Sequence, residues 1–163
     1  MNRFQLVFDQ EQADCDPVAF AKSYENNLCI GHYFLPGAEE AVMALSRKYR
    51  LFLASNGTAS VQKGRMTSAN LYRFFVKSFV SEEIGHNKPS KAYFDAAFAQ
   101  IPNFDPNKAL MVGDSLTSDI KGGNNAGIRT CWVNPNHLPG DPNIHVDYEI
   151  EALHQLPALL EEL

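Results

Sequence analysis

The chain has 163 residues, of which 45% are hydrophobic, and a formal net charge of −5 from 14 basic and 19 acidic side chains. This length predicts one globular domain, and an acidic balance without a basic stripe argues against a nucleic-acid duplex as partner. No apolar run reaches the roughly 18 residues of a membrane span, and the first residues lead into no signal-peptide core. Three scattered cysteines (Cys15, Cys29 and Cys131) fit free thiols in a reducing compartment. We therefore expect a cytoplasmic protein with no membrane partner.

The N-terminal region has a different pattern from the rest of the chain. Asp16 followed by Pro17 predicts the N-cap and first turn of a helix that runs to about Ile30. Residues 4–8 (FQLVF) precede it, and their pattern fits a strand or a further helix. The sequence leaves both alternatives open.

From about residue 37, helical and strand-like segments alternate with short connections. Short continuous apolar runs predict strands buried on both faces, which is typical of parallel sheets covered by helices. The expected strands are 51–54, a segment near 79–81, 109–112 and 130–133. The expected helices are 38–49, 60–75, 90–101, 117–126 with Gly127 as its C-terminal cap, and a last one from about Pro157. This alternation predicts right-handed crossovers and an α/β fold with a doubly wound, mostly parallel sheet.

Polar side chains follow several of these strands, at the edge where doubly wound sheets bind ligands. They are Ser55, Asn56, Gly57, Lys88, Asp114 and Asp119. Two carboxylates in one strand-to-helix turn can hold Mg²⁺, which prefers oxygen ligands. A lysine, a serine hydroxyl and backbone N–H groups nearby can bind phosphate oxygens. Taken singly, each residue has a structural alternative as a turn, a helix cap or a solvated loop residue. Their order along the strand ends favours phosphate chemistry.

These segments also carry a family resemblance. Residues 51–57 (LFLASNG), 87–89 (NKP) and 111–119 (MVGDSLTSD) look like the second, third and fourth motifs of haloacid dehalogenase-like (HAD) phosphohydrolases. The resemblance implies that Ser55 binds phosphate and that Lys88 stabilises the phosphoryl charge. It also implies that Asp114 and Asp119 form the acidic Mg²⁺ motif. The sequence of residues 113–123 and 130–135 is most similar to that of the pyrimidine 5′-nucleotidase subgroup.

The resemblance implies a domain organisation and also shows a departure. It implies a HAD-like Rossmannoid core over residues 35–163 and a remnant of a helical cap over residues 1–34, unless that stretch is a replacement first strand plus a helix. Family members open with a strand ending in Asp-x-Asp, whose first aspartate is the nucleophile. Here Asp9 is followed two positions later by a glutamate, and a strand before it would bury Gln5. We interpret Asp9 as a cap residue and keep the nucleophile role as the alternative.

These observations lead to one main hypothesis and two alternatives. The first is a HAD-type phosphatase that hydrolyses a small phosphorylated metabolite, a pyrimidine nucleoside 5′-monophosphate, through an aspartyl-phosphate. This chain is expected to be a truncated and weakly active or inactive form of it. The alternatives are a noncatalytic HAD-like phosphate-binding or assembly protein, and a capless phosphatase that uses Asp9. The family order places the first strand mid-sheet, so its two neighbours would lack ladder partners unless residues 4–8 fill the gap. An incomplete sheet of this kind could support an oligomer.

Overall fold

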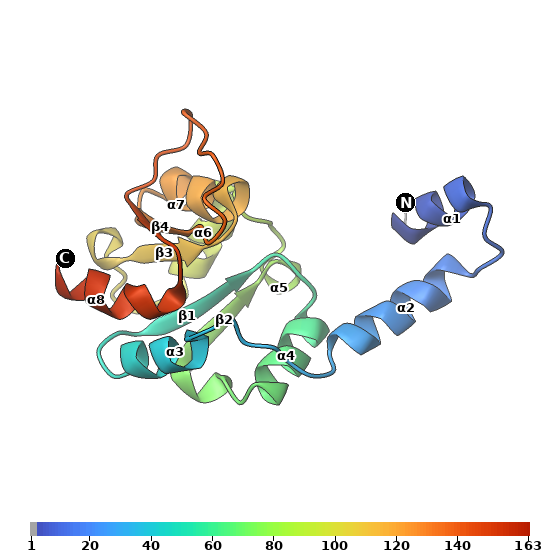
Figure 1. The fold of residues 1–163 in the computed structure, drawn as a ribbon, viewed down its shortest axis with the longest axis horizontal. Coiled ribbons are helices and arrows are strands. Elements are labelled where there is room, and N and C mark those ends of the chain that lie inside the picture. The colour runs from blue at the N-terminus through green and yellow to red at the C-terminus, as the bar shows by residue number, and fades with distance from the viewer. Residues whose placement is uncertain (1–2) are drawn as a thin grey trace.

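The computed structural model describes residues 3–163, which form a helical arm followed by an α/β core (Figure 1). The first expected domain begins with Met1 and Asn2, which lie outside the described residues. The arm consists of α1 (Arg3–Glu11) and α2 (Pro17–Leu28) and extends away from the core. No helix among residues 3–163 has the length and hydropathy needed to cross a membrane.

The arm settles the open alternative for residues 4–8, which are helical rather than extended. The predicted start of α2 is confirmed, because the Asp16 side chain accepts a hydrogen bond from the Val18 backbone N–H at 2.9 Å and a proline opens the helix. Phe20 of α2 packs edge-on against two rings of α1, with centroid distances of 5.0 Å to Phe4 and 5.2 Å to Phe8. No residue of α2 is buried. The arm therefore packs mainly on itself.

The core alternates helices and strands, as the sequence predicts. Its elements are α3 (Ala38–Ser46), β1 (Leu51–Ser55), α4 (Ala59–Ser68), η1 (Tyr72–Phe74), β2 (Phe75–Val80), α5 (Ser81–Ile84), α6 (Lys91–Phe98), η2 (Pro106–Lys108), β3 (Leu110–Gly113), η3 (Leu116–Ile120), α7 (Lys121–Ala126), β4 (Arg129–Val133), β5 (Tyr148–Ile150), η4 (Leu153–Gln155) and α8 (Leu156–Glu161). Gly127 follows α7 with φ at 70°, which confirms the predicted left-handed helix cap.

Two helix predictions need correction. The helix expected over 60–75 ends at Ser68, because Asn70 turns left-handed with φ at 53° and the Leu71 N–H donates back to Met66 O at 3.1 Å. The strand β2 can then begin at Phe75. The helix expected over 117–126 is split into η3, a π-helical turn, and α7.

The strands form two parallel sheets rather than one. Among residues 3–163, β1 pairs only with β2, and β3 and β5 both pair with β4. Within residues 3–163 no ladder joins β1 to β3, and residues 4–8 lie in the arm rather than between them (Figure 1). The parallel α/β prediction is confirmed, whereas a continuous sheet is not present in this part of the chain.

The two sheets nevertheless share the same helix layers. On one face, Leu51 of β1 and Leu110 of β3 pack into a cluster with α3 and α8. On the other face, Phe52 of β1 and Met111 of β3 pack against α6. Because successive side chains of a strand point to opposite faces, the two sheets lie as parts of one layer. The carboxyl ends of β1 and β3 consequently face the same region.

Candidate active site

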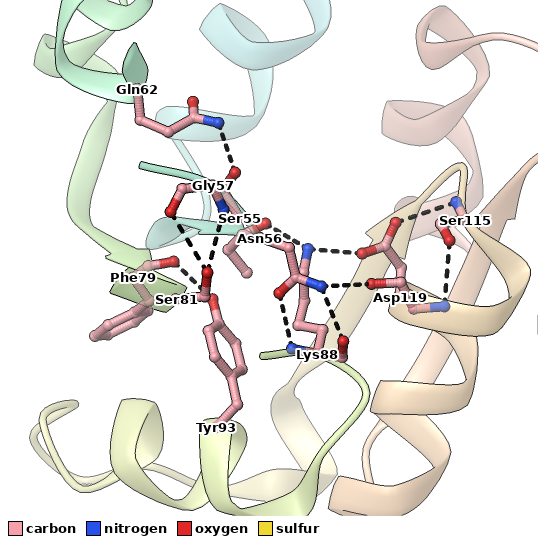
Figure 2. Close-up of polar contacts among 12 residues, drawn as sticks. Ser55, Asn56, Gly57, Gln62, Phe79, Ser81, Lys88, Tyr93, Ser115 and Asp119 are labelled. Atoms are coloured by element: carbon pink, nitrogen blue, oxygen red, sulfur yellow. Dashed lines mark hydrogen bonds and ion pairs between the residues drawn. The ribbon is translucent and has the colours of Figure 1, made fainter. Parts of the chain in front are cut away.

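Lys88 lies at the centre of the polar cluster between the ends of β1 and β3 (Figure 2). Its ammonium group donates to the Ala54 carbonyl oxygen of β1 at 2.7 Å and to Asp119 Oδ1 at 2.7 Å. The side chains of this ion pair are 7% and 8% exposed. A buried charge requires such partners, because transferring each ion from water into the protein interior costs roughly several kcal/mol. An ammonium group has three N–H donors, so two bonds leave one for another acceptor.

The Asn56 side chain holds the backbone of Lys88 in place. Its Oδ1 accepts from the Lys88 N–H at 2.8 Å, and its Nδ2 donates to the Lys88 carbonyl oxygen at 2.8 Å. The same Nδ2 lies 3.3 Å from Ser118 Oγ of η3. This side chain therefore joins the turn after β1 to the loop after α5 and to the turn after β3. The sequence predicts Asn56 as a binding residue, and the structure shows these bonds to protein groups.

Ser55 and Gly57 are held by partners that the sequence did not single out. The side-chain amide of Gln62, in α4, donates to Ser55 Oγ. The Gly57 N–H donates to Ser81 Oγ at 3.2 Å, so this backbone donor is already engaged. Gln62 follows Ser55 by seven positions, in the early part of the helix after β1. A polar side chain early in the helix that follows a strand and a turn is the sequence signal that could have identified Gln62.

Asp119 and Asp114 lie in the turn after β3 but have different environments. Asp119 is buried in η3, where its Oδ2 accepts from the Ser115 N–H at 3.1 Å. A Cβ on Gly113 would overlap the Asp119 side chain, so this close approach depends on glycine. Asp114 is exposed, and its carbonyl oxygen accepts from Trp132 Nε1 at 3.0 Å. The π-helical turn brings Asp119 back toward the strand end, a placement typical of π turns at functional sites.

Tyr93 of α6 packs beneath the cluster and supports it. Its hydroxyl donates to the Phe79 carbonyl oxygen at 2.6 Å, and the residue is 1% exposed (Figure 2). Burial raises the pKa of Tyr93 to about 12. The hydroxyl therefore stays protonated at neutral pH, where it donates to the Phe79 carbonyl oxygen.

The donor set suits a hard cation bound with few protein ligands. Within residues 3–163 no three His, Cys, Asp or Glu side chains are grouped closely enough to enclose a metal ion. Mg²⁺ does not need such a group, because it keeps several waters and binds through one or two carboxylates plus substrate phosphate. Asp114 and Asp119 lie in the same turn after β3, so a Mg²⁺ ion held there would take most of its coordination from water and ligand.

Asp9 does not belong to this cluster. It lies on α1 in the arm, where its carboxylate accepts from Gln5 Nε2 at 2.7 Å. Helix α1 lies apart from β1 and β3 (Figure 1). Among residues 3–163, the hydrogen bonds made by the side chains of Ser55, Asn56 and Lys88 include one carboxylate, that of Asp119.

Comparison with known proteins agrees with this geometry. The sequence model described as haloacid dehalogenase-like hydrolase matches residues 2–133. The chain belongs to this family. The phosphohydrolase-type fold predicted from its motifs is also confirmed by a solved relative, the HAD-hydrolase YfnB of Bacillus subtilis bound to magnesium. That structure superposes with a TM-score of 0.91 at 37% identity, over 98% of this chain and 70% of that one.

Other relatives of this HAD-like hydrolase have named activities. The pyrimidine 5′-nucleotidase PynA of Streptococcus pneumoniae is 35% identical over 98% of this chain and 68% of its own length. The pyrimidine 5′-nucleotidase YjjG of Escherichia coli is 38% identical over 92% of this chain and 67% of its own length. The chain thus spans about two-thirds of the length of these relatives. The expected relation to phosphatases and nucleotidases is confirmed.

Proposed function

We propose that this HAD-like hydrolase binds the phosphate group of a pyrimidine nucleoside 5′-monophosphate at the ends of β1 and β3. The observation that carries the proposal is Lys88, a buried cation with two fixed partners and one further N–H donor. Identity of 35% and 38% to two pyrimidine 5′-nucleotidases supports the choice of substrate class. The reaction class is phosphoric monoester hydrolysis.

Each site residue has a separate part in this proposal. Lys88 supplies a fixed positive charge to the phosphoryl oxygens, and its bonds to Asn56 hold it in place before substrate arrives. The Ser55 hydroxyl donates to a phosphate oxygen while Gln62 donates to the hydroxyl oxygen and orients it. Asp114 and Asp119 would hold Mg²⁺, which when bound neutralises charge on the phosphate.

We propose that binding by this chain exceeds turnover. Hydrolysis through an aspartyl-phosphate needs a carboxylate free to attack phosphorus. Asp119 is already bonded to Lys88 and to the Ser115 N–H, and Asp9 lies in the arm. A noncatalytic phosphate-binding role is therefore the second candidate function, and the same residues carry it.

Calorimetry with UMP and MgCl₂ tests the binding site. Replacing the lysine with an uncharged side chain of similar length, Lys88→Met, should weaken UMP binding roughly 10–100-fold, the effect of losing a hydrogen bond to a charged group. The matched control is Lys91→Met, because Lys91 forms an exposed ion pair with Asp95. Its affinity for UMP should stay within about twofold of the parent.

Two additions make this test decisive. Lys88→Met leaves the Asp119 charge buried without its partner, so circular dichroism must show that this variant is folded. Ser55→Ala serves as a second variant, which leaves the ion pair between Lys88 and Asp119 intact. Ser55→Ala should weaken binding about tenfold or more, the loss of one hydrogen bond to the charged phosphate. Equal binding by the parent and both folded variants would refute the proposed site. Rapid Mg²⁺-dependent phosphate release from UMP or dUMP would refute the low turnover alone.

A further inference from the structure

The peptide unit between Asp114 and Ser115 is held at both of its ends. Its carbonyl oxygen, that of Asp114, accepts a hydrogen bond from Trp132 Nε1 at 3.0 Å. Its N–H group, that of Ser115, donates to Asp119 Oδ2 at 3.1 Å (Figure 2). A trans peptide unit is planar, and its C=O and N–H groups point in opposite directions. The Trp132 indole therefore fixes the direction of the Ser115 N–H, which points at Asp119.

The register of the sheet explains why Trp132 reaches this carbonyl group. Trp132 of β4 pairs with Gly113, the last residue of β3, so the Asp114 carbonyl lies one residue beyond the end of the ladder. The indole is 3% exposed and packs in an apolar cluster with Ile120 and Leu116 of η3. The ring thus supports the π-helical turn by packing, while its N–H holds the peptide unit at the start of that turn.

This hydrogen bond does more than satisfy a buried indole N–H, which needs an acceptor in any fold. The acceptor belongs to Asp114, and the N–H of the same peptide unit binds the carboxylate of Asp119. Rotation of this peptide unit would remove that N–H and turn a carbonyl oxygen toward the carboxylate, where the two oxygens repel each other. One peptide unit therefore connects both residues of the acidic pair to Trp132.

We propose that Trp132 is a positioning residue for a divalent cation bound by Asp114 and Asp119. This role rests on the Mg²⁺ site of the proposed function, and it adds a residue that acts through a peptide unit rather than on the ion itself. Groups behind the ligands orient them, and orientation before binding strengthens affinity because less freedom is lost. Mg²⁺ is sensitive to ligand placement, since it demands near-ideal octahedral geometry.

Calorimetric titration of the intact chain with MgCl₂, without nucleotide, tests this role. Trp132→Phe keeps an aromatic ring but removes the N–H donor, and it should weaken Mg²⁺ binding roughly five- to tenfold, the effect of one hydrogen bond. The matched control is Ile144→Ala, which removes apolar volume from the same cluster and leaves the indole N–H in place. Its affinity for Mg²⁺ should stay within about twofold of the parent. Equal weakening by the two folded variants, or no weakening by Trp132→Phe, would overturn the proposal.

A spectroscopic measurement on the parent chain makes the test independent of whether Trp132→Phe folds. Trp132 is the one tryptophan in the sequence, so the isotope-labelled chain gives a single indole N–H resonance in its NMR spectrum. This resonance should shift saturably with added MgCl₂ and reach half-saturation at the dissociation constant found by calorimetry. Mg²⁺ binding that leaves the indole resonance unmoved would overturn the proposal.

Asp114→Asn separates failure of this role from failure of the Mg²⁺ site. We expect this variant to weaken Mg²⁺ binding more than Trp132→Phe does, because it removes a charged ligand. If Asp114→Asn weakens binding and folded Trp132→Phe does not, the Mg²⁺ site is supported and the role of Trp132 alone is refuted. If Asp114→Asn binds Mg²⁺ as the parent does, the Mg²⁺ site is wrong and the role of Trp132 is refuted with it.

Discussion

Phe20 in the arm and Phe94 in the core are both helical residues that contact two other aromatic rings, yet their burial differs greatly. Phe20 is 45% exposed, whereas Phe94 is 2% exposed. The difference is the sheet: α6 covers side chains of β1, β2 and β3, whereas α2 packs mainly on two helices, α1 and α4. Contacts between aromatic rings therefore do not bury a side chain fully unless a second layer of structure, here the sheet, covers it.

The arm should accordingly be the less stable part of the chain. Isolated helices shorter than about 12–15 residues are marginal in water, and α1 has 9 residues and α2 has 12. Local opening with a small free energy is expected where few apolar contacts are buried. The site of Ser55, Lys88 and Asp119 lies wholly in the more stable core. Four tests, each built on substitutions, examine this contrast.

The largest effect is expected from truncating the two phenylalanines. Phe94→Ala should lower the free energy of unfolding by about 3–5 kcal/mol, because it leaves a cavity among Tyr93, Phe98 and the sheet. Phe20→Ala should lower it by less than about 1 kcal/mol, since the ring is partly exposed. Urea denaturation followed by the fluorescence of Trp132, which is 3% exposed in the core, measures both. Equal losses would show that the arm and the core unfold as one unit.

A smaller loss is expected at the polar support of β4. Asp147 Oδ2 accepts from the Thr130 N–H at 2.8 Å and from its hydroxyl at 2.9 Å, and Thr130 is fully buried. Asp147→Ala should cost about 2–3 kcal/mol at neutral pH, because it leaves these donors unpaired. Asp141→Ala, on an exposed loop, is the control and should cost much less.

The Asp147 contribution should also depend on pH. Burial raises the pKa of this carboxyl, but hydrogen bonds from Thr130 and the nearby His145 outweigh burial and hold it below the ordinary value of 3.8. A lowered folded-state pKa gives stability that is present above the unfolded value and is lost as pH falls through the folded value. The difference between parent and Asp147→Ala should therefore shrink below about pH 4. A constant difference down to pH 2 would mean that the charge of Asp147 contributes nothing.

The core was predictable from sequence where local patterns determine structure. Apolar runs predicted β1, β3 and β4, and Asp16 and Gly127 marked helix ends because capping depends on a few neighbouring residues. The positions of Ser55 and Lys88 near one another followed from the parallel fold, since parallel strands bring their carboxyl ends to one edge. Their chemical roles remain predictions.

The rest depends on contacts between distant segments or on weak local preference. Residues 4–8 fit two periods equally, and only the helical arrangement lets Gln5 reach Asp9 at i,i+4. The break between β1 and β3 was expected from the family order of strands unless residues 4–8 filled it, and their helical conformation leaves it open within residues 3–163. The hydrogen bonds from Gln62 to Ser55 and from Asn56 to Lys88 could not be predicted, because they form only where the turns pack together in the fold.

The junction between arm and core offers a third test. A Cβ on Gly64 of α4 would lie 2.8 Å from the Cys29 Cβ and 2.8 Å from its carbonyl oxygen, so Gly64→Ala should push the end of α2 away. Cys29 should then react several-fold faster with a maleimide in a Cys15→Ser background, whereas the unfolding of the core should change by no more than about 1 kcal/mol. Unchanged labelling with a destabilised core would place the strain inside the core instead.

The smallest effect is expected from replacing Asp9, and a result of no effect is informative. Asp9→Asn retains an oxygen that can accept from Gln5, and the residue is exposed on α1, so UMP binding and any phosphate release should stay within about twofold of the parent. Loss of phosphate release would contradict this placement and show that Asp9 serves as the nucleophile. The arm would then have to close over Ser55 and Lys88 during the reaction, and Gly64→Ala, which moves the arm, should reduce release as well. A loss in Asp9→Asn with full release in Gly64→Ala would place Asp9 at the site by a route other than the junction of α2 and α4.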